Sequence, residues 1–423
     1  MTFMNLFTKE TRTALRGYIL AFFNWLIIGM ALGGIGGGIG ALFAKAISYG
    51  VGLRTANGWM LYLLPVAGIF SVAIYKLCRV SDVGTNRILE SARSNQKVPM
   101  LLSPAIFAGT VLSHTFGASA GREGAALQLG GSLSAMLSKM LRLKENSKRI
   151  LTMCGMAAVF SALFGTPLGA AVFSIEVISV GQLCSAAIFP CLVSSISAYY
   201  VSVTLMHTHP EHFGIESVPA FDPDALWRVA VIGIAGAVVS IIFCNALHIS
   251  EHFARVILKN EYLRIFAGGL LIVGLTTLVG TRDYNGGGID VITRIFESGD
   301  VKHEAFMLKI LFTAITVAAG FKGGEIIPTM FIGATTGGSL AILLGLNPGF
   351  GAAVGIAALF CGVTNCPLGT MVLCIELFGS EGMIFFALSI AISFLLSGKC
   401  SLYSKQEFLF SKLNTNTSDI FPE

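Results

Sequence analysis

The sequence predicts an all-α, polytopic membrane protein built from two homologous halves of short, broken helices. Hydrophobic residues make up 54% of the 423-residue chain and charged residues only 12%, whereas soluble proteins carry about 25% charged residues. Several apolar stretches are interrupted by glycine or are shorter than the ~20 residues that a spanning helix needs. A long internal repeat, described below, divides the chain in two. These three observations determine the predicted fold class.

The first apolar segment runs from about residue 18 past residue 42, and no signal-peptide cleavage pattern interrupts it. Lys9, Arg12 and Arg16 precede it, so the positive-inside rule predicts a cytoplasmic N-terminus. Residues 33–40 read GGIGGGIG, and their spacing also matches a dinucleotide-binding fingerprint. Because the run lies inside a membrane segment, we expect it to pack helices closely through small residues.

Further apolar stretches follow along the chain. They lie at about 57–78, 99–116, 127–141, 150–178, 181–206, 225–248, 263–280, 305–320, 326–345, 351–378 and 382–398. The basic linker at residues 139–149 is predicted to be cytoplasmic, and the polar connector at residues 206–221 is expected to be exposed. The nine cysteines form no CxxC pair, so we expect buried free thiols rather than a zinc or redox site.

An internal repeat is the strongest organising signal. Residues 155–177 read GMAAVFSALFGTPLGAAVFSIEV, and residues 355–377 read GIAALFCGVTNCPLGTMVLCIEL. Glu176 and Glu376 end the two copies at matched positions, and we expect them to cap or pair near an interface. If each half crosses the membrane an odd number of times, the halves are inverted and the substrate site lies where they meet. The predicted units are a first transmembrane half (17–205), the connector (206–221), a second transmembrane half (222–400) and a C-terminal segment with a tail (401–423).

The stretch GREGAALQ at residues 121–128 places Arg122 and Glu123 between two apolar runs. Such charges cost about 2.5–3.5 kcal/mol each on insertion scales, so they normally face a cavity, a partner or an ion path. The flanking glycines permit close approach of the backbone to a ligand, and a helix starting here presents free N–H groups to an anion. The stretch predicts an anion cradle with the Glu123 carboxylate above it. A buried structural Arg122–Glu123 pair is the alternative.

The second half has a counterpart, GFKGGEIIP, at residues 320–328. Pro328 suits the first turn of a helix, where no N–H is needed. Lys322 and Glu325 again place charges at membrane depth, and two such helix N-termini aimed at one point would make an anion site of backbone amides. Glu325 is therefore a candidate second carboxylate, with a structural pairing to Lys322 or Arg122 as the alternative.

The motifs GREGxxxQxGG, RLKxxxxxR, PLGAAxFxIE, GGxxxP and a late SGKxxLYS occur in this order over residues 16–406. This arrangement resembles the CLC family of chloride channels and anion/proton antiporters. The resemblance implies a CLC-type inverted repeat of short, tilted helices and a homodimer with one ion path per subunit. We expect no CBS domains in the C-terminal tail.

The resemblance also implies roles for individual residues. Glu123 matches the gating glutamate, which blocks the path when charged and carries protons. Tyr403 matches a tyrosine whose hydroxyl reaches the anion from inside, although an interfacial anchor is the alternative. The anion-binding positions that the resemblance implies are Gly124, Ala125, Ile326, Ile327, Tyr403, Val83 and Asn86.

Other details are more similar to the fluoride/proton antiporter branch of the family. They are the pattern GFKGGExxP, the sequence GTRDY with a glycine-rich turn at residues 280–288, and CIELFG at residues 374–379. Val177 stands where proton-coupled chloride members carry an internal glutamate, and Ile327 stands where the fluoride branch usually has threonine. We expect fluoride/proton antiport that exports fluoride, and chloride/proton antiport or a passive chloride channel is the alternative.

Other functional classes find less support in the sequence. No nucleophile–base pair stands at membrane depth, and His207, His209 and His212 lack a strict ligand pattern, so we expect no enzyme, cofactor or metal. A narrow path argues against a transporter of larger anions. The expected partners are a small inorganic anion, protons, the lipid bilayer and a second copy of the chain. Basic loops explain the net charge of +5, so no nucleic acid is invoked, and we expect a multi-pass protein of a bacterial inner (plasma) membrane.

Overall fold

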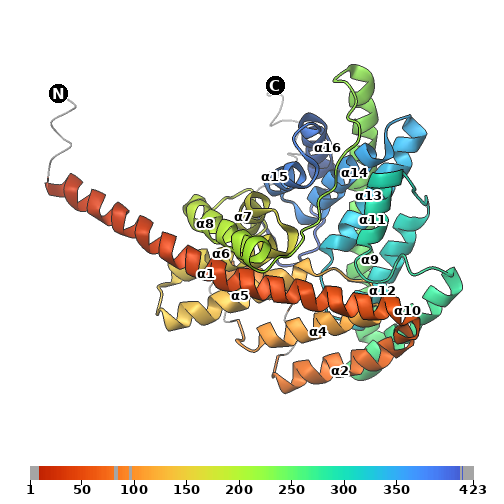
Figure 1. Cartoon of the computed structure of the whole chain (residues 1–423), viewed down its shortest axis with the longest axis horizontal. Helices are drawn as coiled ribbons and strands as arrows, with labels where there is room; N and C mark the ends of the chain where they lie inside the picture. Colours follow the sequence, from red (N-terminus) through yellow and green to blue (C-terminus); the bar gives the residue numbers. More distant parts are fainter. Residues whose placement is uncertain (1–8, 81–83, 95–97, 410–411, 413–423) are drawn as a thin grey trace, which may run out of the picture.

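Helix α1 (Lys9–Ala56) is 48 residues long and runs across one face of the molecule, as Figure 1 shows in red. This computed structural model describes residues 9–80, 84–94, 98–409 and 412. Val83, an anion-site candidate, and the end of the tail from residue 413 lie outside the described residues. Helices make up the described chain apart from loops and two strands of two residues each, as the all-α prediction expects.

The remaining elements follow the order of the predicted segments. Before the connector they are η2 (Gly58–Leu63), α2 (Leu64–Leu77), α3 (Thr85–Ser94), α4 (Leu102–Phe116), α5 (Glu123–Met140), α6 (Glu145–Phe164), α7 (Pro167–Glu176), β1 (Ser179–Val180), η3 (Ser185–Ala187), α8 (Ile188–Tyr199) and η4 (Tyr200–Leu205). After it they are α9 (Pro223–Ile257), α10 (Glu261–Val279), α11 (Ile289–Ser298), α12 (Ala305–Ala319), α13 (Ile326–Leu344), α14 (Pro348–Thr364), α15 (Pro367–Phe378), α16 (Met383–Leu396) and β2 (Glu407–Phe408). Seven described helical segments are long and apolar enough to cross a membrane, and other apolar helices are shorter.

The glycine run of α1 packs this helix against α8, as predicted. A Cβ atom at Gly33 would lie 2.4 Å from the carbonyl oxygen of Ser194. A Cβ atom at Gly37 would lie 2.6 Å from the carbonyl oxygen of Ala198. These distances are too short for any side chain, so only glycine allows α1 and α8 to approach so closely.

Both copies of the internal repeat contain the same helix break. The chain restarts as α7 at Pro167 and as α15 at Pro367. Two positions earlier stands a left-handed residue, Gly165 or Asn365, and such a residue commonly ends a helix. Proline suits the restart because the first turn needs no N–H. Each of the two apolar stretches is therefore a pair of helices rather than one.

The two short helices that follow these breaks cap each other's N-termini. Glu176, at the end of α7, accepts hydrogen bonds of 3.2 and 2.6 Å from the N–H groups of residues 368 and 369 in α15. Glu376, in α15, accepts hydrogen bonds of 2.9 and 2.6 Å from the N–H groups of residues 168 and 169 in α7. A carboxylate at a helix N-terminus satisfies unpaired donors and complements the helix dipole. The predicted capping role of both glutamates is confirmed.

The connector, predicted to be exposed, is exposed only in part. Phe213 is buried and stacks on Phe296 with a ring-centroid distance of 5.2 Å. Its backbone N–H donates a 3.1 Å hydrogen bond to the carbonyl oxygen of Leu377. One aromatic side chain thus anchors an otherwise polar segment, because its apolar surface gains more from burial than from contact with water.

The segment after α16 folds back against the ends of both repeats. The Leu402 N–H donates to the carbonyl oxygen of Val363 at 2.9 Å, and β2 pairs in parallel with β1. The Gln406 Nε2 group donates to the carbonyl oxygens of Val177 and Thr364 at 3.0 and 2.7 Å. These bonds hold the intervening Tyr403 in the interior of the molecule.

Candidate functional site

Two helix N-termini meet in the interior of the molecule. Helix α5 begins at Glu123 and α13 begins at Ile326, within the two stretches where the sequence predicts helix starts. Just before them, Gly121 and Gly324 exchange two antiparallel backbone hydrogen bonds of 2.6 Å each. Because each N-terminus presents free N–H groups and the positive end of a helix dipole, the pair forms an electropositive centre made of backbone.

Only glycine permits this close approach. A Cβ atom at Gly324 would lie 2.3 Å from the backbone nitrogen of Gly124. A Cβ atom at Gly121 would lie 2.6 Å from Glu123 Oε2 and 3.1 Å from the backbone nitrogen of Ile327. The Glu123 carboxylate and the first amides of α13 are therefore neighbours across the pair of hydrogen bonds.

The Glu123 side chain is fully buried between the two N-termini, with 0% exposed. Its Oε2 atom accepts a 2.9 Å hydrogen bond from the Arg122 backbone N–H, and its Oε1 atom lies 3.4 Å from Arg122 Nε. The ion pair that the sequence left as an alternative is thus present. Within the described residues Oε1 has no hydrogen-bond partner, so a hydrogen bond holds only one carboxylate oxygen. Arg122 also pairs with Glu211 of the connector at 3.8 Å.

A glycine-rich turn lies against the loop that precedes Glu123. The buried Lys309 ammonium of α12 donates hydrogen bonds of 3.2 and 2.7 Å to the carbonyl oxygens of Tyr284 and Gly286 in this turn. The Gly286 N–H in turn donates to the carbonyl oxygen of Ala118 at 3.1 Å. Lys309 therefore fixes the turn on one side of the Glu123 loop. Sequence reasoning missed this residue, because one lysine in an apolar helix does not indicate which loop it contacts.

Asp283, at the rim of the same turn, carries the clearest charge cluster outside the membrane helices. Its carboxylate lies 2.9 Å from Arg294 Nη2 and 2.9 Å from Lys302 Nζ. Partial burial would raise the pKa of Asp283, but the hydrogen bond from Lys302 and the charges of both cations outweigh this and hold the pKa below its usual range. The carboxylate is therefore ionised at neutral pH and connects α11 to the start of α12.

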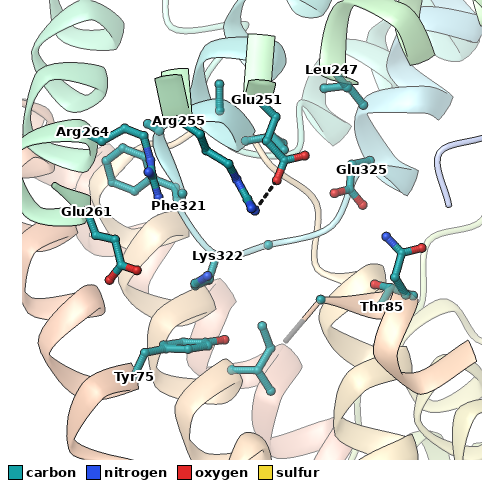
Figure 2. A pocket seen from close by; sticks show the side chains of 18 of the residues that line it. Tyr75, Thr85, Leu247, Glu251, Arg255, Glu261, Arg264, Phe321, Lys322 and Glu325 are labelled. Atoms are coloured by element: carbon teal, nitrogen blue, oxygen red, sulfur yellow. Dashed lines mark hydrogen bonds and ion pairs between the residues drawn. The ribbon is translucent and has the colours of Figure 1, made fainter. Parts of the chain in front are cut away.

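A cavity of about 780 Å³ lies on the other side of the meeting helices (Figure 2). We call it the basic cavity. Its charged lining residues are the basic Lys76, Arg79, Arg255, Lys259, Arg264 and Lys322 and the acidic Glu251, Glu261 and Glu325. Of the predicted site residues, Glu325, Tyr403 and Asn86 line this cavity. The excess of basic side chains gives the cavity a field that attracts anions.

Tyr403 and Asn86 differ in how their polar atoms are used. The Tyr403 hydroxyl is buried and has no hydrogen-bond partner among the described residues. A buried donor without a partner costs about 1–3 kcal/mol, so the hydroxyl suits a bound anion that would accept its hydrogen bond. The Asn86 Oδ1 atom already accepts a 3.2 Å hydrogen bond from the Lys405 backbone N–H.

Glu325 is the N-cap residue of α13 and lies against the first turn of α5. A Cβ atom at Gly124 would lie 3.5 Å from its Oε2 atom. Behind the same turn, Thr85 donates to the Gly124 carbonyl oxygen at 3.4 Å, and Gln128 donates to Thr85 at 3.3 Å. Sequence reasoning did not single out Thr85 or Gln128, although an amide side chain within the apolar α5 is a usable signal.

The position of the family's internal glutamate holds no titratable group in this chain. Val177 is buried, and its backbone carbonyl oxygen accepts the 3.0 Å hydrogen bond from Gln406. Among the residues that the structure describes, no three His, Cys, Asp or Glu side chains are placed to hold a metal ion. Two carboxylates stand at the meeting helices, Glu123 in the first half and Glu325 in the second.

Comparison with known proteins assigns this architecture to a family. The family model described as "Voltage gated chloride channel" matches residues 67–398. The chain belongs to this family. A "Chloride/fluoride channel protein" of Pseudomonas syringae pv. tomato is 35% identical over 420 residues, which cover 97% of this chain and 91% of that relative.

Solved structures agree with the family assignment. The crystal structure of a CLC-type fluoride/proton antiporter matches with a TM-score of 0.88 and 28% identity, over 95% of this chain and 100% of that one. A slow cyanobacterial Cl⁻/H⁺ antiporter matches with a TM-score of 0.77 and 19% identity, over 88% of this chain and 94% of that one. The protein is thus an anion-transport protein of the CLC family and an integral, multi-pass protein of the bacterial inner membrane.

Proposed function

We propose that the protein exchanges fluoride for protons and thereby exports fluoride from the cell. The observation that carries the proposal is the buried Glu123 carboxylate between the facing N-termini of α5 and α13. Two similar proteins give further support, because one is named a chloride/fluoride channel protein and the other a fluoride/proton antiporter. In this proposal Glu123 is both the gate and the proton carrier.

The anion would bind in the cradle of backbone amides at the two helix N-termini. Fluoride is small and strongly hydrated, so its site must replace lost water with several hydrogen-bond donors. The amides of α5 and α13 point positive dipole ends at one place, and the Tyr403 hydroxyl would add a donor from the side of the basic cavity. The residues assigned to this cradle are Gly124, Ala125, Ile326, Ile327, Tyr403, Val83 and Asn86.

Glu123 would couple the two ions by competing with the anion. An ionised carboxylate beside the amide cradle occupies the position of an anion and blocks the path. Protonation removes its negative charge, so fluoride then replaces it and the neutral side chain moves away with its proton. The carboxylate would leave one backbone hydrogen bond and its ion pair with Arg122 when it moves.

The basic cavity would face the cytoplasm. Helix α1 starts on the side predicted to be cytoplasmic by the positive-inside rule, and α2 returns to that side, where Lys76 and Arg79 line the cavity. A cytoplasmic basic cavity would collect fluoride from the cell interior by electrostatic attraction. This orientation matches the proposed direction of transport.

The same proposal includes a homodimer with one ion path in each subunit. The adjacent short helices α7 and α15 carry Leu168 and Leu368 in their first turns, and these residues are 46% and 52% exposed. An apolar face of this kind suits a partner subunit, since a two-fold axis would bring the same helices of both copies together. Cross-linking between purified subunits in lipid would test the dimer.

Ion flux from proteoliposomes tests the transport proposal. We expect purified protein in liposomes to move fluoride well ahead of chloride, and uphill when an imposed proton gradient drives it. Fluoride-selective and chloride-selective electrodes measure the two fluxes, and a pH electrode measures the protons. Equal or faster chloride flux would overturn the fluoride assignment, and flux that ignores the proton gradient would overturn antiport.

The variant Glu123→Gln tests the role of the gate. Glutamine keeps the size of the side chain but neither carries the negative charge nor accepts a proton. We expect proton flux coupled to fluoride to fall by about tenfold or more, as for loss of a proton-transfer group. Retained proton-coupled flux in this variant would remove Glu123 from the mechanism, even if the wild type is an antiporter.

The second candidate function is chloride/proton antiport or a passive chloride channel. It is favoured by Ile327, which places an apolar side chain where the fluoride branch usually offers a threonine hydroxyl. The same flux measurement separates these possibilities, because a channel passes chloride down its gradient without proton movement.

A further inference from the structure

The basic cavity contains three carboxylates among six basic side chains, and they lie in different surroundings. Glu261 pairs with Lys76 at 3.5 Å near the surface, and about half of each side chain is exposed. Glu325 lies deepest, against the first turn of α5. Glu251, from α9, lies between these extremes, since 38% of its side chain is exposed. Glu251 therefore lies between the cavity water and Glu325, where a single proton relay would stand, whereas Glu261 is already paired with Lys76.

The Glu251 carboxylate pairs with Arg255 at 2.7 Å and faces the cavity that Glu325 also lines. Figure 2 shows its carboxylate between Arg255 on one side and Glu325 on the other, and both glutamates line the same cavity. Both carboxylates therefore face the same space, in which water connects them to each other.

A proton route from this cavity needs a titratable group other than residue 177, because Val177 offers only hydrocarbon and a backbone carbonyl. We propose that Glu251 accepts protons from the water of the basic cavity and passes them through Glu325 to Glu123. The inference rests on the proposed proton coupling. It adds the residue through which protons reach the site.

The transfer balances without any further reactant. Protonated Glu251 gives its proton through cavity water to the Glu325 carboxylate, and the O–H bond broken on one acid is formed on the next. Glu251 returns to a carboxylate and is held by Arg255 Nη2 at 2.7 Å. Glu325 then gives the proton to Glu123 when that side chain is ionised. Arg255 thus holds the Glu251 carboxylate in place between transfers.

The other ionisable groups around Glu251 do not duplicate this role. His248 lies on the same helix, Arg264 comes from α10, and Lys322 precedes α13. Arginine and lysine stay protonated at neutral pH, so they tune the relay without passing protons. The Tyr403 hydroxyl at the cavity end also keeps its proton at neutral pH. His248 also offers a titratable side chain in this cavity, so the variant His248→Gln belongs in the test.

The experiment compares Glu251→Gln with Glu261→Gln in proteoliposomes, with fluoride and proton flux recorded together. Both variants remove one carboxylate from the basic cavity, so they change its net charge equally. We expect Glu251→Gln to lower proton flux by about tenfold or more while fluoride leaks without protons. We expect Glu261→Gln and His248→Gln to keep the wild-type ratio of protons to fluoride.

Two further variants distinguish loss of the titratable group from misfolding of Glu251→Gln. Glu251→Asp and Glu251→His both keep a titratable group, so each should restore proton flux that Glu251→Gln lacks. Normal proton coupling in Glu251→Gln would overturn the inference, and so would equal loss in Glu261→Gln. If the wild type itself moves fluoride without protons, the proposed antiport fails; if the wild type is coupled and Glu251→Gln is equally coupled, only the relay fails.

Discussion

Two buried tyrosines line the basic cavity, and their different surroundings give them different expected roles. Tyr75 and Tyr403 both line the cavity, and both hydroxyls lack a hydrogen-bond partner among the described residues. The Tyr75 ring faces the Lys322 ammonium at 4.4 Å from its centroid, and this contact uses the ring rather than the hydroxyl. Tyr403 is held by the bonds of its segment to the ends of both repeats.

We expect Tyr403→Phe to weaken fluoride binding by about tenfold, since a hydrogen bond to a charged group contributes about 1.5–3 kcal/mol. Tyr75→Phe is the matched control, because it removes the same group from the same cavity and keeps the ring under Lys322. The fluoride concentration at half-maximal flux measures the effect. Equal weakening in both variants would mean that Tyr403 has no special contact with the anion.

At the scale of elements, the short helices α7 and α15 depend on each other for their N-terminal caps. Neither helix has a side-chain cap at its own N-cap residue. Each instead has its first free N–H groups satisfied by a glutamate of the other helix, with bonds of 2.6–3.2 Å. Because helices of 10 and 12 residues are marginal by themselves, the exchanged caps tie their stability together.

We expect Glu176→Ala and Glu376→Ala to destabilise the protein by similar amounts, about 1–2 kcal/mol each, as for other lost caps. Each change leaves two N–H donors of the opposite helix without a partner. Glu381→Ala, at an exposed position beyond the end of α15, serves as the control. Thermal unfolding of purified protein in detergent gives the measurement, and wild-type stability of both cap variants would show that the exchange is energetically unimportant.

On the scale of the whole molecule, acid should loosen the turn that carries Asp283. Its pKa is lowered in the folded protein, so its stabilising effect is fully present above the unfolded-state pKa and is lost as pH falls through the folded pKa. We expect the unfolding temperature of the wild type to fall more steeply below about pH 4 than that of Asp283→Asn. Parallel pH profiles for the two proteins would contradict this.

Local sequence signals predicted much of the architecture. Glycine and proline mark where α7, α13 and α15 begin, because they act on their own backbone positions. The repeat located Glu176 and Glu376, and the charges at membrane depth located Glu123 and Glu325. Each of these signals is contained in a few consecutive residues or in one spacing.

Contacts between segments that are distant in the sequence could not be predicted from such local signals. The pairing of Arg122 with Glu211 joins a helix start to the connector, and no periodicity indicates that the connector folds back over this site. Glu251 faces the cavity only because α9 ends beside the start of α13. The spacing of apolar residues in a sequence predicts which face of a helix is buried. It does not predict which other helix covers that face, because this depends on how all the helices pack.

The exchanged caps of α7 and α15 have a consequence for how this chain could be assembled from parts. In a symmetric dimer, residue i of one subunit contacts residue j of the other, and j contacts i in return. Glu176 with residues 368–369 and Glu376 with residues 168–169 reproduce that relation within a single polypeptide. Each half therefore supplies one glutamate that caps a helix of the other half. Each half also contains the helix N-terminus that the glutamate of the other half caps. Two separately synthesised halves would thus meet as matched partners through these caps.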